Sequence, residues 1–251
     1  MTTSPTALII GASRGLGLAL TREWLSRGWT VVATVRSAGH SGLHETVQTS
    51  GGRLMIEQLE MTDLAAVKAL GERLSGLELD LLFVNAGVAN GAGDRVDQVS
   101  TEEFTRVMVT NALSPMRIVE RLGELVRPNG TIAVMSSSLG SVSLNEKGGW
   151  EVYRASKAAL NTLMRSYAAR HAGDRRSLAL VDPGWVRTEM GGSAASLGIE
   201  ESIPGVADAL AARHGQSGLR YFNYKGETVP WWARCRPVTY FLRGICRPPV
   251  R

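Results

Sequence analysis

Apolar and polar positions along this chain alternate between two patterns. Short, continuous apolar runs, typical of strands buried on both faces, lie at 7–10, 30–35, 53–60, 79–84, 131–136, 177–182 and 219–224. Between them, helical patterns are expected at 15–27, 41–50, 62–75, 101–123 and 150–171. The chain therefore alternates strand and helix over most of its length.

This alternation predicts the α/β class, because right-handed crossovers between parallel strands place helices on both faces of one sheet. We expect a single-domain, doubly wound (Rossmann) sheet of seven parallel strands. A length of 251 residues suits one such domain. It is expected over residues 1–232, with residues 233–251 as a basic C-terminal extension.

Charge separates the extension from the rest of the chain. The net charge is +5, and residues 233–251 hold five arginines and no acid, so the body is neutral. The basic character therefore predicts no nucleic-acid partner. Three interpretations of the extension stay open: a cap over a pocket, a contact with an anionic membrane, or a loosely ordered end. No apolar run approaches the length of a membrane span and no signal peptide is recognised, so a cytoplasmic protein is expected.

A glycine-rich turn follows the first apolar run. The segment GASRGLG (11–17) opens a predicted helix, where backbone N–H groups and the helix dipole favour a phosphate. A helix-entry turn without a ligand is the alternative. The second strand ends without the acid that binds the ribose of NAD, and it carries Arg36, while Arg14 lies in the turn. Arginine suits a 2′-phosphate, so NADP(H) is favoured over NAD(H).

The predicted helix at 150–171 carries a tyrosine and a lysine four residues apart. Tyr153 and Lys157 would share one helix face. An ammonium group beside a phenol favours the phenolate, so Lys157 is expected to lower the pKa of Tyr153 and make it a general acid/base. Alone, this spacing is common on helices and indicates nothing.

The two motifs occur in order with four others: NAG (85–87), Asn111, SSSLG (136–140) and PGWVRT (183–188). With this set, the chain resembles the short-chain dehydrogenase/reductase family over residues 5–232. Within that family it is most similar to the branch of C-factor-like proteins and small carbonyl reductases. The resemblance implies a catalytic domain over residues 1–232.

The resemblance also implies a role for each matching residue. In the catalytic set, Tyr153 exchanges a proton with the substrate oxygen, and Lys157 binds the nicotinamide ribose. Ser137 binds the substrate oxygen, although Ser136 and Ser138 are its neighbours, and Asn111 holds a relay water. The expected cofactor-binding residues are Gly11, Ser13, Arg14, Gly15, Leu16, Gly17, Arg36, Glu60, Met61, Asn85, Ala86, Gly87, Tyr153, Lys157, Pro183, Gly184, Val186 and Thr188.

The implied activity is NAD(P)H-dependent transfer of a hydride between nicotinamide and a small or medium carbonyl or alcohol substrate. No metal is expected, and relatives imply a homodimer or homotetramer. The alternative is a nucleotide-binding sensor or signalling protein of the same fold with little turnover. The complete Asn-Ser-Tyr-Lys set favours the enzyme, because a sensor needs no proton relay.

Overall fold

The computed structural model describes residues 4–37, 39 and 41–231, so the expected extension at 233–251 lies outside the described residues. Seven strands form one sheet in the order β3-β2-β1-β4-β5-β6-β7, and every neighbouring pair is parallel. The predicted doubly wound fold is confirmed. The strands are β1 (Thr6–Ile10), β2 (Thr30–Val35), β3 (Leu54–Gln58), β4 (Leu79–Val84), β5 (Val126–Met135), β6 (Ser177–Asp182) and β7 (Gly218–Asn223).

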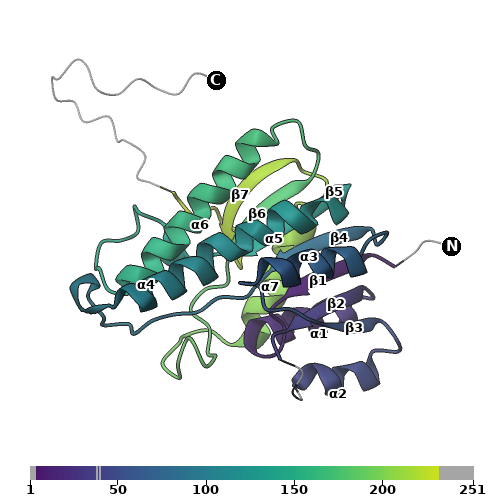
Figure 1. Ribbon diagram of the computed structural model, residues 1–251, viewed down its shortest axis with the longest axis horizontal. Coiled ribbons are helices and arrows are strands. Elements are labelled where there is room, and N and C mark those ends of the chain that lie inside the picture. Colours follow the sequence, from purple (N-terminus) through teal and green to yellow (C-terminus); the bar gives the residue numbers. More distant parts are fainter. Residues whose placement is uncertain (1–3, 38, 40, 232–251) are drawn as a thin grey trace.

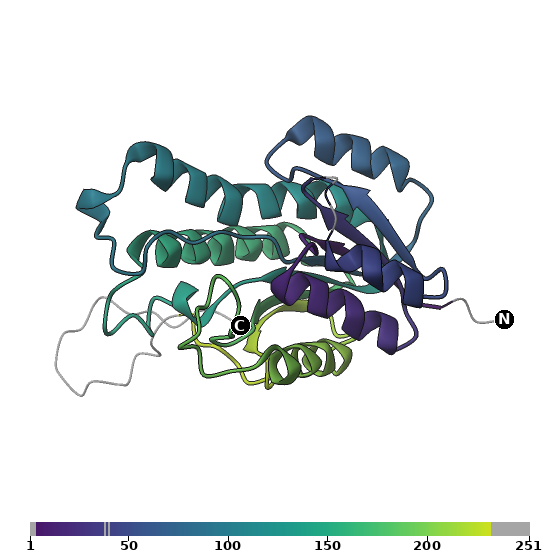
Figure 2. The same ribbon diagram turned by 90° about the horizontal axis from the view of Figure 1, so that it is seen from below.

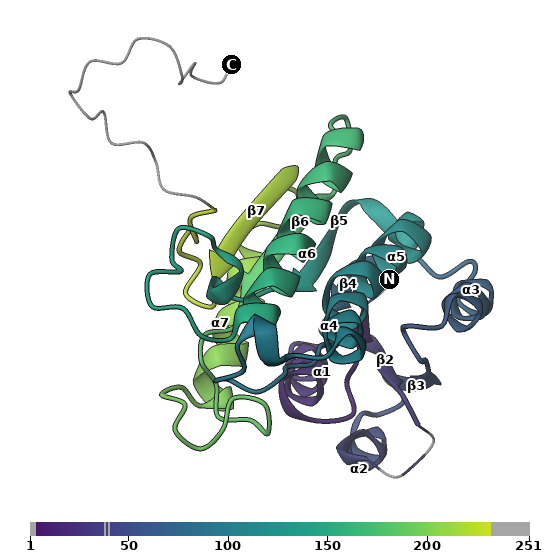
Figure 3. The same cartoon turned by 60° about the vertical axis from the view of Figure 1, so that its left-hand side comes forward.

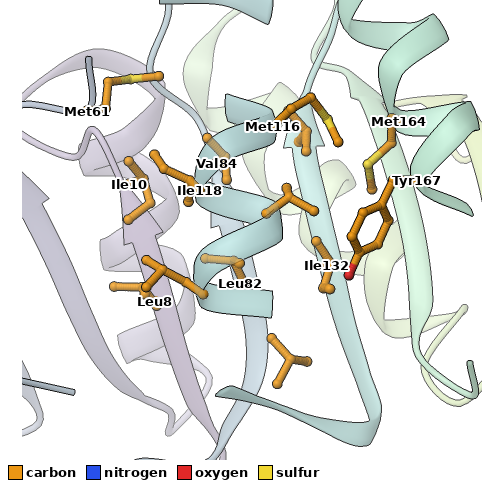
Figure 4. Packing of buried hydrophobic residues seen from close by; sticks show 14 of the residues in the cluster. Leu8, Ile10, Met61, Leu82, Val84, Met116, Ile118, Ile132, Met164 and Tyr167 are labelled. Carbon is orange, nitrogen blue, oxygen red and sulfur yellow. The ribbon is translucent and has the colours of Figure 1, made fainter. Parts of the chain in front are cut away.

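Helices cover both faces of this sheet (Figures 1 and 3). One face packs against α1 (Gly15–Ser26), α2 (Gly42–Thr49) and α7 (Ile199–Ala211). On the other face lie α3 (Leu64–Arg73), α4 (Thr101–Met108), α5 (Ser114–Leu122) and α6 (Glu151–Arg170). Each strand alternates its side chains between the two layers, because successive residues of a strand point to opposite faces. Leu8 and Ile10 of β1 join the cluster shown in Figure 4, whereas Ala7 and Ile9 join the other.

The predicted long helix at 101–123 is interrupted. Residues Val109–Leu113 form a π-helical turn between α4 and α5, and Asn111 lies inside it. Such turns are rare and occur mostly at functional sites. The side chain of Asn111 is fully buried and bonds to Val88 in the loop after β4 and to Ser156 on α6.

The crossover helix α7 was missed in the sequence. Pro204 and Gly205 lie inside it and obscure the helical pattern. Gly205 is required by packing, since a Cβ there would lie 2.5 Å from the carbonyl oxygen of Tyr224. The connection itself could have been foreseen, because two parallel strands need a long crossover between them.

The carboxyl ends of the strands meet at one edge, which positions the site. The loops after β1, β4, β5 and β6 gather there, at the end of the molecule away from the N-terminus (Figure 2). In doubly wound folds, ligands bind at this edge. Across the part of the chain that the structure describes, no helix is long and apolar enough to cross a membrane.

Phe83, on the central strand β4, has no exposed surface and packs among residues of β1, β5 and α1. We expect Phe83→Ala to lower the free energy of unfolding by about 3–5 kcal/mol, because the cavity cannot collapse between two helical layers. Leu64→Ala, at a residue that is 49% exposed at the start of α3, is the control and should stay within about 1 kcal/mol of wild type. Denaturant unfolding measures both, and equal losses would contradict the described core.

Candidate active site

The glycine turn after β1 is shaped by its contacts. Gly11 has a φ of +83°, and a Cβ there would lie 2.6 Å from the Cβ of Ala86. At Gly17 a Cβ would lie 2.1 Å from the carbonyl oxygen of Gly11. Over Gly15, by contrast, a Cβ would meet only Thr188, at 4.0 Å. The turn is therefore tightly packed at Gly11 and Gly17 and open at Gly15.

The same turn presents free N–H groups. Helix α1 begins after Arg14 without a side-chain cap, and its first turn holds no acid. The amide of Asn85 donates to the carbonyl oxygen of Gly11 over 2.8 Å, which fixes the turn from the neighbouring strand. Ser13 and Leu16 are half-buried at the helix entry. An anion fits here, because uncapped N–H groups and the positive end of the helix dipole converge.

Two arginines adjoin this turn. Arg36 is exposed directly after β2, and its backbone carbonyl accepts from the side chain of Gln58 over 3.3 Å. Arg14 forms an ion pair of 2.5 Å with Glu189, and both side chains are about three-quarters exposed. The sequence did not predict Glu189 as a partner. An exposed pair of this kind contributes little stability, so a phosphate can replace the carboxylate at small cost.

Glu60 and Met61, the two residues expected near the adenine, lie in different surroundings. Glu60 accepts from the backbone N–H and the hydroxyl of Thr62, over 3.0 Å and 2.8 Å. Met61 is only 7% exposed, and its side chain packs in the core beside Ile10 (Figure 4). A ligand could therefore contact only the backbone of Met61. The spacing of residues in the sequence does not reveal this.

Lys157 lies at the centre of the site and is only 3% exposed. Its ammonium group donates to the carbonyl oxygen of Met135, at the end of β5, over 2.9 Å. A Cβ on Gly87 would lie 3.6 Å from its Nζ, so the glycine leaves room for the lysine head. Burial lowers the pKa of Lys157 to about 8. The group is therefore charged at neutral pH but close to losing its proton.

Asn111 ties the loop after β4 to α6. Its Oδ1 accepts from the backbone N–H of Val88 over 2.8 Å, and its Nδ2 donates to the carbonyl oxygen of Val88 over 2.7 Å. The same Nδ2 donates to Ser156 over 3.0 Å. The predicted set thus converges, with Asn111 holding the strand edge and the helix together. Val88 and Ser156 were not singled out in the sequence.

The three serines after β5 have different surroundings. Ser136 donates to the side chain of Asn161 over 2.6 Å and is buried. Ser138 contacts the carboxylate of Asp182, whereas the Ser137 side chain bonds to Tyr153. The hydroxyl of Ser137 also accepts from the N–H of Leu139 over 3.2 Å. Ser137 is therefore the serine that shares the site with Tyr153.

The pKa of Tyr153 differs from the prediction. Burial, with a smaller effect of the Asp182 charge, raises the pKa of Tyr153 to about 12, against a lowering by the bond to Ser137. The prediction that Lys157 lowers the pKa of Tyr153 is wrong, because the surrounding residues of this chain raise that pKa. The ammonium group lies 5.7 Å from the centre of the phenol ring and is bonded to Met135 instead. The phenol therefore keeps its proton at neutral pH.

Asp182 and Tyr221 belong to the site but were missed. Asp182 ends β6, is 6% exposed, and accepts from the N–H of Gly184 over 3.2 Å. Burial raises the pKa of this carboxyl group. The hydroxyl of Tyr221, on β7, donates to the carbonyl oxygen of Ser137 and so holds the serine loop. An acid directly before the Pro-Gly pair was the available signal for Asp182.

The segment after β6 closes the site. The carbonyl oxygen of Pro183 accepts from Ser202 over 2.7 Å, and Gly184 has a φ of +79°. Val186 is buried and pairs with Leu197, and the hydroxyl of Thr188 accepts from the N–H of Gly191 over 3.0 Å. The predicted residues thus line the path from the glycine turn toward Asp182.

A dinucleotide fits the open side of this arrangement. Free N–H groups lie at the start of α1, the space over Gly15 is open, and a buried ammonium group lies between the strand ends. Among the described residues, no group of three or more His, Cys, Asp or Glu side chains could hold a metal ion.

Known proteins are similar to this chain in sequence and fold. The family model described as short chain dehydrogenase matches residues 5–196, so the chain belongs to this family. A structure from Burkholderia multivorans, described as a short-chain dehydrogenase/reductase with bound NADP, is 52% identical with a TM-score of 0.90, covering 91% of this chain and 100% of that chain. A carbonyl reductase from Pseudomonas aeruginosa PAO1 in complex with NADP is 36% identical with a TM-score of 0.85, covering 91% and 100%.

A shorter match is with the C-signal protein of Myxococcus xanthus. It is 34% identical over 155 residues, which are 61% of this chain and 93% of that protein. The predicted branch of C-factor-like proteins and small carbonyl reductases is therefore confirmed.

The lowered pKa of Lys157 makes it a cost to stability. The folded pKa of about 8 lies below the usual 10.5, so the penalty is complete below pH 8 and disappears as pH rises toward 10.5. We expect Lys157→Met to unfold at a higher temperature at neutral pH, by an advantage of about 1–2 kcal/mol after the loss of the bond to Met135.

This advantage should vanish near the upper end of the pH window. Thermal unfolding at several pH values measures it, with Lys68→Met as the control, because Lys68 is exposed on α3. A Lys157→Met protein that is less stable than wild type at neutral pH would contradict the buried charge.

Proposed function

We propose that this protein is an NADP(H)-preferring oxidoreductase that interconverts small or medium carbonyl compounds and alcohols. The proposal rests on one observation. The protonated phenol of Tyr153 and the buried ammonium group of Lys157 lie close together at the carboxyl edge of the sheet. The relatives support it: carbonyl reductases in complex with NADP share the fold and about a third of the sequence. We further propose that residues 1–232 are the catalytic domain and that 233–251 are a basic extension.

The chain's own residues perform three tasks. Ser137 and Tyr153 bind the substrate oxygen, because a hydrogen bond between their side chains holds the two hydroxyl groups close together. Tyr153 donates its proton to that oxygen as negative charge develops on it, which a phenol with a raised pKa is able to do at neutral pH. Lys157, which is charged up to about pH 8, places its ammonium group 5.7 Å from the centre of the phenol ring while negative charge develops on the oxygen. A bound nicotinamide supplies or accepts the hydride.

These roles favour reduction of a carbonyl at neutral pH. For alcohol oxidation Tyr153 would first have to lose its proton, and burial together with Asp182 opposes that loss. The pKa of Lys157 sets the upper pH limit of the reduction, because the charge of Lys157 disappears above about pH 8. Asn111 positions α6, the helix that carries Tyr153 and Lys157, through its bonds to Val88 and Ser156.

The sensor alternative has weaker support. A nucleotide-binding protein without turnover has no use for a buried lysine that lowers its stability. The positions of Ser137, Tyr153 and Lys157 have a purpose only where a proton moves.

An association of two or four chains is also proposed. Phe104 on α4, Leu113 in the π-helical turn and Leu163 on α6 are each about 40% exposed on the same layer of the molecule. Burying such apolar side chains favours self-association. We also place the enzyme in the cytoplasm, since a reductase depends on a supply of reduced nicotinamide.

Loss of the phenol hydroxyl tests the proposal. We expect Tyr153→Phe to lower kcat/KM for NADPH-dependent reduction of a carbonyl panel by about 100-fold or more, because the proton donor is removed. NADPH absorbance measures turnover, and NADPH fluorescence checks that binding persists. Tyr167→Phe, on the same helix but in the core, is the matched control. Wild-type turnover in Tyr153→Phe, or no turnover in wild type, would contradict the proposal.

The cofactor preference rests on Arg36. We expect Arg36→Asp to lower kcat/KM for NADPH by about 10- to 100-fold and to raise that for NADH, since a carboxylate repels the 2′-phosphate and binds ribose hydroxyls. Arg175→Asp makes the same charge change at an exposed position just before β6, on the opposite edge of the sheet. Equal effects of the two substitutions would show that only net charge matters.

A further inference from the structure

The backbone is unusual directly before the catalytic helix. Trp150 has a φ of +55°, and it is the one non-glycine residue with a positive φ among those the structure describes. Gly148 and Gly149, which precede it, also have positive φ values, of +66° and +70°. A side chain with a Cβ rarely adopts this conformation, and it persists only where neighbours enforce it, most often at functional sites.

Hydrogen bonds from the loop after β4 and from α6 enforce this conformation. The N–H of Trp150 donates to the carbonyl oxygen of Ala92 over 3.0 Å, and its own carbonyl accepts from the N–H of Arg154 over 2.7 Å. The guanidinium group of Arg154 donates to the carbonyl oxygens of Gly149 and Gly148, over 2.9 Å and 3.4 Å. The turn is therefore fastened on both sides.

A further bond joins the segment after β4 to the first residue of α6. The carboxylate of Glu151 accepts from the N–H of Val96 over 2.9 Å. The loops after β4 and β5 thus meet at the start of α6, where Trp150 lies. Residues 144–149 are all exposed, whereas Trp150 is half-buried, so the chain turns inward at this side chain.

The indole ring lies beside the proton donor. Its centre is 6.0 Å from the centre of the Tyr153 ring, and the two ring planes meet at 64°. Lys157 lies over the Tyr153 ring at 5.7 Å. A carbonyl compound whose oxygen is bonded to Tyr153 would therefore lie within reach of the indole ring.

We propose that Trp150 is a specificity-determining residue that selects carbonyl substrates carrying a flat aromatic or conjugated group. A fixed indole offers a flat apolar face, and aromatic pairs gain free energy beyond their buried area. Because hydrogen bonds fix the backbone that carries the ring, less conformational freedom is lost on binding than in an unrestrained loop. This inference rests on the proposed carbonyl reduction.

Two ketones of equal skeleton test the proposal. Acetophenone carries a flat ring and cyclohexyl methyl ketone a puckered one, so their kcat/KM ratio reports the shape of the group beside the carbonyl. In Trp150→Gly, glycine keeps the left-handed backbone and removes only the indole. We expect the ratio to shift against acetophenone by about three- to tenfold, the range of one aromatic contact. Trp150→Phe keeps a ring and should keep most of the preference.

The control separates the ring from the loop. Val142→Gly places a glycine in the same loop, at a side chain that is 71% exposed, and should leave the ratio of the two ketones as in wild type. An unchanged ratio in Trp150→Gly, or an equal shift in Val142→Gly, overturns the inference. A wild-type enzyme that reduces other carbonyls but not acetophenone also overturns it. Absence of turnover on every carbonyl counts instead against the proposed function.

Discussion

The buried ammonium group of Lys157 is the constraint on which the rest of the site depends. A charge with almost no exposed surface needs partners, and one strand end supplies its bond through the carbonyl oxygen of Met135. Gly87 has no side chain that would fill the space beside it. Asn111 holds the helix that carries the lysine against the loop after β4. A group placed this way lowers stability, which is the usual sign of selection for chemistry.

The same burial decides which proton the site delivers. Burial of the Tyr153 phenol and the nearby carboxylate of Asp182 keep the phenol protonated at neutral pH, while the lysine stays charged up to about pH 8. A neutral donor beside a fixed positive charge suits an oxygen that becomes negative as a hydride arrives. The parallel sheet brings these groups together, because Met135 and Asp182 end their strands, and Gly87 follows β4, at the same edge.

Much of this could be predicted from the sequence. Continuous apolar runs located all seven strands, and the ordered motifs located the glycine turn and the Tyr153–Lys157 pair, because these depend on local spacing. Contacts between distant segments could not be predicted: the Glu189 partner of Arg14, the packing of Met61 into the core, and the three different surroundings of the serines. Helix α7 was hidden by Pro204 and Gly205, and the π-helical turn at Asn111 leaves no pattern in the residues.

The expected lowering of the Tyr153 pKa failed for the same reason. Spacing places two side chains on one helix face, but burial is a property of the whole fold and outweighs the charge at that distance. The most direct test of the account is the pH dependence of kcat/KM for carbonyl reduction at saturating NADPH, from about pH 6 to pH 10. The account predicts a level profile below about pH 8 and a decline above it as Lys157 loses its charge. A rate that rises with pH over this range would contradict it.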